Sequence, residues 1–119
     1  MKVSNIKNGK RVSVTHGELY LLPVSKVPKG KSSEHSMFVL AHSETGHNHV
    51  LQAEPKTTFT VTEVGDAVER FLSVSAPVKL VHQKTFDVHQ TRVLAPGDYR
   101  VYYKQEYDIR EKVMRAVFD

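Results

Sequence analysis

The sequence predicts an all-β fold, a single small antiparallel barrel or sandwich. Two observations predict it. Short runs rich in Val, Ile, Thr, Tyr and Phe alternate apolar and polar residues, as strands with one buried face do. Turn residues such as Gly46, Gly65-Asp66 and Pro96-Gly97 separate these runs by hairpin-length connections, which favours antiparallel pairing.

About nine strands are expected along the chain. In order, they are Lys10–Thr15, Glu18–Val24, Met37–His42, His47–Ala53, Thr57–Val64, Val68–Val74, Val78–His82, His89–Leu94 and Tyr99–Glu106. Residues 25–36, rich in Lys, Ser, Pro and Gly, are expected to form a long flexible loop or a docking arm. The tail Ile109–Phe118 leaves two interpretations open, a helix or a last strand, and the strand is slightly favoured.

Composition limits the classes of function. At 119 residues the chain is expected to form one domain, residues 1–119, with an apolar fraction of 39% and a charged fraction of 25% that are ordinary for a globular protein. No apolar run approaches the ~20 residues of a membrane span, and no signal core is apparent. The lack of cysteine excludes disulfides and thiol chemistry and fits a cytoplasmic location, or a virion if the protein is phage-encoded. The net charge of +4 comes from scattered basic residues, so a nucleic-acid partner is not expected.

Three of the seven histidines lie around one predicted turn, in the segment Ala41–His49. His47 and His49 are two positions apart on a predicted strand, so their side chains point to the same face. If Ser43–Gly46 forms a hairpin loop, His42 lies opposite His47 and shares that face. Imidazole nitrogens bind divalent transition metals at about 2.0–2.1 Å, so three converging rings predict a metal site.

Two further histidines, His82 and His89, flank a predicted connection and are the expected additional ligands. His82 ends an alternating apolar stripe, so it is preferred over His89. We therefore expect a site for Zn, Fe, Ni or Mn built from His42, His47 and His49 and completed by His82 or His89. The histidines in predicted loops are expected to take no part, namely His16 and His35.

The run His47–Glu54 resembles the first half of the cupin signature, two histidines followed by a glutamate. Cupins are small β-barrels in which two such histidines, the glutamate and a further histidine hold a divalent metal. The resemblance implies a cupin-like barrel with Glu54 as a ligand. Strict alternation along the strand instead points Glu54 away from His47 and His49, unless Pro55 or a bulge rotates it. The second cupin motif has no counterpart, because no histidine follows the Pro96-Gly97 turn.

The segments His42–His49 and Pro96–Tyr107 also resemble a group of short bacterial and phage proteins, a likeness that implies no activity. The leading prediction is a divalent-metal-binding protein, and whether it is an enzyme stays open. The alternative is a non-catalytic assembly module, such as a phage structural or adaptor protein, whose histidines are structural. In that case, exposed strands or the 25–36 arm would make contacts within a homo-oligomer or a larger assembly.

Overall fold

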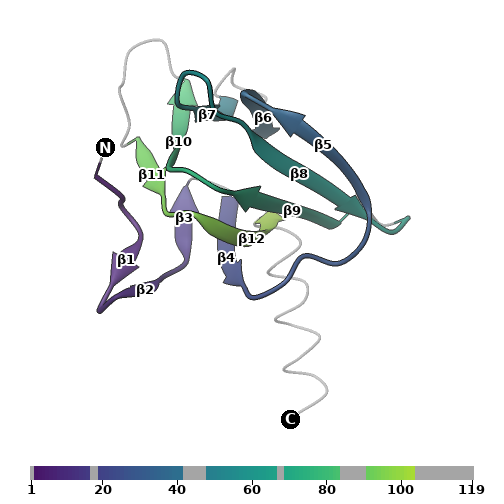
Figure 1. Cartoon of the computed structure of the whole chain (residues 1–119), viewed down its shortest axis with the longest axis horizontal. Helices are drawn as coiled ribbons and strands as arrows, with labels where there is room; N and C mark the ends of the chain where they lie inside the picture. Colours follow the sequence, from purple (N-terminus) through teal and green to yellow (C-terminus); the bar gives the residue numbers. More distant parts are fainter. Residues whose placement is uncertain (1, 17–18, 42–47, 67–68, 84–90, 104–119) are drawn as a thin grey trace.

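A computed structural model of the chain describes residues 2–16, 19–41, 48–66, 69–83 and 91–103, except the side chains of residues 82 and 83 (Figure 1). All regular structure in these ranges consists of antiparallel strands arranged in three sheets. The all-β class expected from the sequence is therefore confirmed. No helix of a length and apolarity that could cross a membrane occurs in the described ranges.

The largest sheet has six strands. They are β3 (Val14–His16), β4 (Leu19–Val24), β5 (Lys31–His35), β8 (Phe59–Val64), β9 (Glu69–Val74) and β12 (Gly97–Tyr103). Their order across the sheet is β3-β4-β12-β9-β8-β5 (Figure 1). β12, late in the chain, is therefore a central strand, and Tyr99 and Val101 on it are fully buried.

A second sheet has four strands. They are β6 (Met37–Ala41), β7 (Asn48–Ala53), β10 (Val78–Gln83) and β11 (Arg92–Leu94), in the order β11-β10-β7-β6. A separate ribbon pairs β1 (Ile6–Lys7) with β2 (Lys10–Arg11) across a turn in which Asn8 and Gly9 both have positive φ, the geometry that suits a two-residue hairpin. The pairings leave β3, β5, β6 and β11 at sheet edges, so within the described residues the sheets do not close into a barrel.

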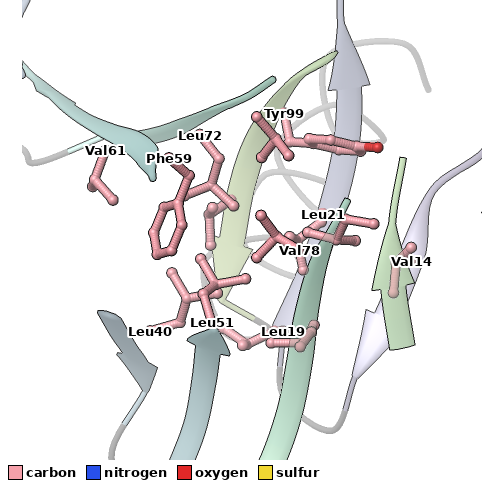
Figure 2. Packing of buried hydrophobic residues seen from close by; sticks show 14 of the residues in the cluster. Val14, Leu19, Leu21, Leu40, Leu51, Phe59, Val61, Leu72, Val78 and Tyr99 are labelled. Atoms are coloured by element: carbon pink, nitrogen blue, oxygen red, sulfur yellow. The ribbon is translucent and has the colours of Figure 1, made fainter. Parts of the chain in front are cut away.

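The two larger sheets share one hydrophobic core (Figure 2). Alternation along the strands selects its members: Phe59 and Val61 on β8 are almost fully buried, whereas Thr60 between them is half-buried. Figure 2 shows Phe59 of the six-stranded sheet facing Leu40 and Leu51 of the four-stranded sheet. Burying each such side chain contributes about 1.5–3 kcal/mol, so this shared core is the main force that joins the sheets.

The predicted strands Met37–His42 and His47–Ala53 correspond to β6 and β7, which pair in antiparallel fashion with a bulge that the sequence did not reveal. Val39 pairs with Val50, but the next pair is Ala41 with His49. Leu40 is the extra residue, and both Leu40 and Ala41 are buried. A bulge bends its strand and increases the local twist, so β6 is redirected beside His49.

Residues 25–36, expected to form a loop, contain strand β5. β5 pairs with β8 from Lys31–Glu63 to His35–Phe59 and forms an edge of the six-stranded sheet. The expectation of a continuous loop was wrong because an edge strand that is exposed along its length needs no apolar alternation, so its polar sequence gives no periodic signal.

The predicted strand Lys10–Thr15 is divided into β2 and β3, and Asn5 explains the division. The Val12 amide donates to the Asn5 carbonyl (2.9 Å), and the Asn5 Nδ2 donates to the Val12 carbonyl (3.2 Å). The same Nδ2 donates to the Tyr99 hydroxyl (2.9 Å), and the Ala95 amide donates to Asn5 Oδ1 (2.8 Å). Asn5 thus ties the N-terminal segment to the chain around β12.

Arg70 on β9 makes a polar connection between the two large sheets. Its guanidinium donates to the Tyr103 hydroxyl (2.5 Å), which itself donates to the Leu40 carbonyl (2.6 Å). The guanidinium also lies 5.2 Å from the centre of the Phe38 ring, a cation–π contact. Through these contacts a β9 side chain fixes the position of β6.

Candidate metal centre

Of the five histidines predicted as ligands, the structure describes His49 in full. His49 lies on β7 and is 4% exposed. His82 is described by its backbone, near the end of β10. The remaining predicted ligands lie outside the described residues: His42, His47 and His89.

The strand register brings two of the predicted positions together. His49 on β7 is the direct partner of His82 on β10, and on its other side it pairs with Ala41 of β6. Directly opposed residues on antiparallel strands have Cα atoms about 4.5–5.5 Å apart. The histidine at the end of the β10 stripe therefore lies next to His49, as a shared site requires. His42 follows Ala41 directly in the chain, and the predicted Ser43–Gly46 turn lies outside the described residues.

A histidine that the sequence analysis set aside is the closest partner of His49. His16 is the last residue of β3, in the other large sheet, and is 8% exposed. Its Nδ1 lies 2.8 Å from Nδ1 of His49, and the rings meet edge to face with centroids 4.9 Å apart at 80°. Two imidazoles from two different sheets therefore make direct contact in a buried place.

The expectation that His16 lies in a loop and takes no part was wrong about the loop. β3 continues to His16, with Val14 and His16 buried on one side and Thr15 exposed on the other. This alternation is the signal that could have identified it, because Val14-Thr15-His16 repeats the apolar-to-histidine stripe seen before His82. The predicted strand ended at Thr15, one residue before His16.

The contact between the two rings is a hydrogen bond. At 2.8 Å one Nδ1 carries a hydrogen and donates it, while the other Nδ1 is deprotonated and accepts. Two nitrogens bound to one tetrahedral ion at about 2.05 Å would lie about 3.3 Å apart. Insertion of an ion between His16 and His49 would thus require the two nitrogens to separate by about 0.5 Å.

Glu54, the glutamate of the partial cupin motif, does not reach this place. β7 runs without interruption from Asn48 to Ala53, so Glu54 follows its far end, about 16 Å from His49 along the strand. The Glu54 carbonyl accepts hydrogen bonds from the amide (3.0 Å) and the hydroxyl (2.7 Å) of Thr57, as in a turn. Glu54 and His49 therefore cannot bind the same ion.

Among the described side chains, no group of three His, Asp or Glu residues is placed to hold one metal ion. His35 stands apart from the pair: it lies on β5, its Nε2 is 2.7 Å from the Ser33 hydroxyl, and its ring packs against Phe38. What the described part of the structure provides is the His16–His49 pair, with the His82 position beside it.

The geometry defines a class: an antiparallel β protein with a buried histidine pair between two sheets. The chain belongs to the family described as Domain of unknown function (DUF8820), whose profile matches residues 15–104. The matched segment contains both His16 and His49. No curated protein and no solved structure matches the chain.

Proposed function

We propose that this protein binds a divalent transition metal ion, Zn, Fe, Ni or Mn, at the junction of β3, β7 and β10. The observation that carries the proposal is the 2.8 Å approach of the His16 and His49 Nδ1 atoms in a buried place. An ion would replace the hydrogen that the two rings share, because imidazole must be deprotonated at the nitrogen that binds metal. His49 is the central ligand, and His16 is added to the set expected from sequence.

The remaining ligands of the proposed site come from the sequence prediction. His82 is the leading third ligand because the register pairs its position with His49. His47 and His42 adjoin the described ends of β7 and β6 in the chain and stay in the predicted set, as does His89. A site with three histidines keeps one tetrahedral position for water or a substrate, which is the arrangement of catalytic rather than structural zinc.

The proposal includes a cupin-like arrangement of the two sheets. Its support is a core shared by two antiparallel sheets, with histidines from both sheets meeting between them. The proposed metal site differs from the cupin motif in one ligand, because Glu54 lies too far from His49 to take part.

Metal analysis of untagged protein tests the proposal. After loading with Zn²⁺ and removal of excess ion, the parent should retain about one ion per chain by mass spectrometry. His49→Gln, which keeps a polar side chain in the buried position, should lose it. His35→Ala is the matched control, since it removes a described histidine distant from the pair in the fold and should retain the ion. A parent that retains no ion, or a His49→Gln variant that retains as much as the parent, would refute the proposal.

One observation favours a second candidate function, the non-catalytic assembly module. β5 is an exposed edge strand of the six-stranded sheet, and such an edge can add a strand from another chain. The partner would be a second copy or a larger assembly, in the cytoplasm or in a virion. Light scattering decides: a constant mass of 13.5 kDa at all concentrations and in lysate-derived fractions would reject assembly.

A further inference from the structure

The six-stranded sheet has a hollow of about 280 Å³ on the face turned away from the core. Thr60 and Ser73 lie at its centre and alternate along their strands with the buried Phe59 and Val74, so they face outward. The polar residues that line it are Glu34, Thr58, Thr60, Ser73, Ser75 and Asp98. Among the residues that the structure describes, no lysine or arginine contributes to the lining.

Four of these residues form one straight row across four strands. Glu34 on β5 pairs with Thr60, Thr60 pairs with Ser73, and Ser73 pairs with Asp98 on β12. The row therefore has a carboxylate at each end and two hydroxyls between them. With strands about 4.8 Å apart, the Cα atoms of Glu34 and Asp98 are separated by about 14 Å.

The polar groups of this row differ from those of the neighbouring row. In the neighbouring row, the Ser32 and Thr62 hydroxyls hydrogen-bond each other at 2.8 Å. The hydroxyls of Thr60 and Ser73, and the carboxylates of Glu34 and Asp98, have no hydrogen-bond or ion-pair partner among the described residues. These polar groups are therefore available to bond a ligand in the hollow.

The cations near Asp98 are engaged by other groups. The Arg11 guanidinium donates to the backbone carbonyls of Asp98 (2.6 Å) and Val24 (3.2 Å) and forms no ion pair with the Asp98 carboxylate. Arg100 is on the same face, two residues beyond Asp98 on β12. Its guanidinium lies 3.7 Å from the Glu69 carboxylate and 4.6 Å from the Tyr102 ring centre, and both of these residues lie on the side away from Asp98. Glu63 likewise has an arginine, Arg70, at 3.9 Å. Neither carboxylate of the hollow thus forms an ion pair with a described residue, in a chain whose net charge is +4.

We propose that this hollow binds an organic polycation, the ammonium groups of a di- or polyamine or of neighbouring lysine side chains. One ammonium group pairs with Glu34 and another with Asp98, and the hydroxyls of Thr60 and Ser73 accept hydrogen bonds from N–H groups between them. Because the row has a carboxylate at each end, charge complementarity favours a ligand with two or more positive charges.

Two other classes of ligand fit less well. A single metal ion cannot be shared by Glu34 and Asp98, since metal–oxygen bonds are about 2.0–2.6 Å and the carboxylates belong to residues about 14 Å apart. A saccharide usually stacks on an exposed aromatic ring, and the aromatic residue at the hollow, Phe59, is 2% exposed.

Calorimetric titration with spermidine, at low and at physiological salt, tests the proposal. Glu34→Gln and Asp98→Asn should each weaken spermidine binding about fivefold, the effect of one exposed ion pair. Glu54→Gln and Asp66→Asn remove the same charge outside the hollow and should change affinity less than twofold. Trilysine is the second probe: the same pattern with trilysine assigns the ammonium groups to a protein partner, and the pattern with spermidine alone assigns them to a free polyamine.

Three results would overturn the proposal. The first is no binding of either probe to the parent. The second is an equal loss of affinity in the Glu54→Gln and Asp66→Asn controls, which would mean general attraction to negative charge. The third is tighter binding of a neutral sugar such as maltose than of spermidine. All four substitutions are at surface-accessible positions, so each variant should keep the melting temperature of the parent. Measuring that temperature verifies that each variant retains the fold.

Discussion

Replacement of Asn5 by alanine is expected to destabilise the protein by about 3 kcal/mol. Asn5 is 1% exposed, and its side chain makes three hydrogen bonds to separate parts of the chain. Nδ2 donates to the Tyr99 hydroxyl (2.9 Å) and to the Val12 carbonyl (3.2 Å), and Oδ1 accepts from the Ala95 amide (2.8 Å). Alanine removes all three bonds at once.

The size of this destabilisation depends mainly on the polar groups that lose their partner when Asn5 is replaced. Each lost hydrogen bond costs about 0.5–1.5 kcal/mol net, and the Ala95 amide, buried at 3% exposure, loses its acceptor and adds about 1–3 kcal/mol. The Tyr99 hydroxyl limits the total because it keeps its own bond to the Ala95 carbonyl (2.6 Å). A loss of about 3 kcal/mol is a large share of the ~5–15 kcal/mol that stabilise a typical domain.

Urea unfolding of Asn5→Ala beside Tyr99→Phe measures the effect. Tyr99→Phe removes the hydroxyl but leaves the Ala95 amide bonded to Asn5, so its free energy of unfolding should fall by only about 1–2 kcal/mol. A free energy for Asn5→Ala within about 0.5 kcal/mol of the parent, or a greater loss in Tyr99→Phe than in Asn5→Ala, would refute the reasoning.

Three further predictions concern other parts of the fold. Gly97→Ala should lower the melting temperature and cost about 1–3 kcal/mol, since Gly97 has a φ of 142° and its added Cβ would collide with the Arg11 guanidinium; an unchanged melting temperature would contradict this. Arg70→Lys should cost about 1–2 kcal/mol in urea unfolding, because one ammonium group cannot replace the guanidinium contacts between the sheets, and a neutral result would argue against them. If the metal site exists, His82→Ala should alter the absorption spectrum of the Co²⁺-loaded protein more than His89→Ala does; the opposite order would select the other histidine.

The sequence predicted the strands that have one buried face and did not predict those that have none. Runs such as Phe59–Val64 alternate because one side packs in the core, so both their existence and their approximate bounds follow from the pattern. β5 pairs with β8 at the edge of the sheet and exposes most of its side chains, so its polar composition does not mark it as a strand. The bulge at Leu40 depends on how β6 fits against both sheets, which is information that a single run of residues does not contain.

Sequence patterns could identify candidate residues that lie within one sheet, but not the histidine contact between the two sheets. Alternation along the strand placed His82 at the end of an apolar stripe, and the structure pairs this position with His49 on the neighbouring strand. His16 meets His49 because two sheets face each other, although the two residues are 33 positions apart in the chain. Spacing rules for hairpins and motifs cannot predict such a contact, because it depends on how the two sheets pack around the core.

The family match begins at residue 15, whereas the contacts of Asn5 and Ser4 lie before it. Ser4 exchanges hydrogen bonds with the backbone of Val93, its amide donating to the Val93 carbonyl (2.7 Å) and its hydroxyl accepting from the Val93 amide (2.9 Å). A recombinant polypeptide trimmed to the matched segment would therefore lose the N-terminal residues that bond the backbone of β11 and the buried polar groups near Tyr99. The boundaries of an expressed fragment of this chain are therefore better set by these contacts than by the limits of the family match.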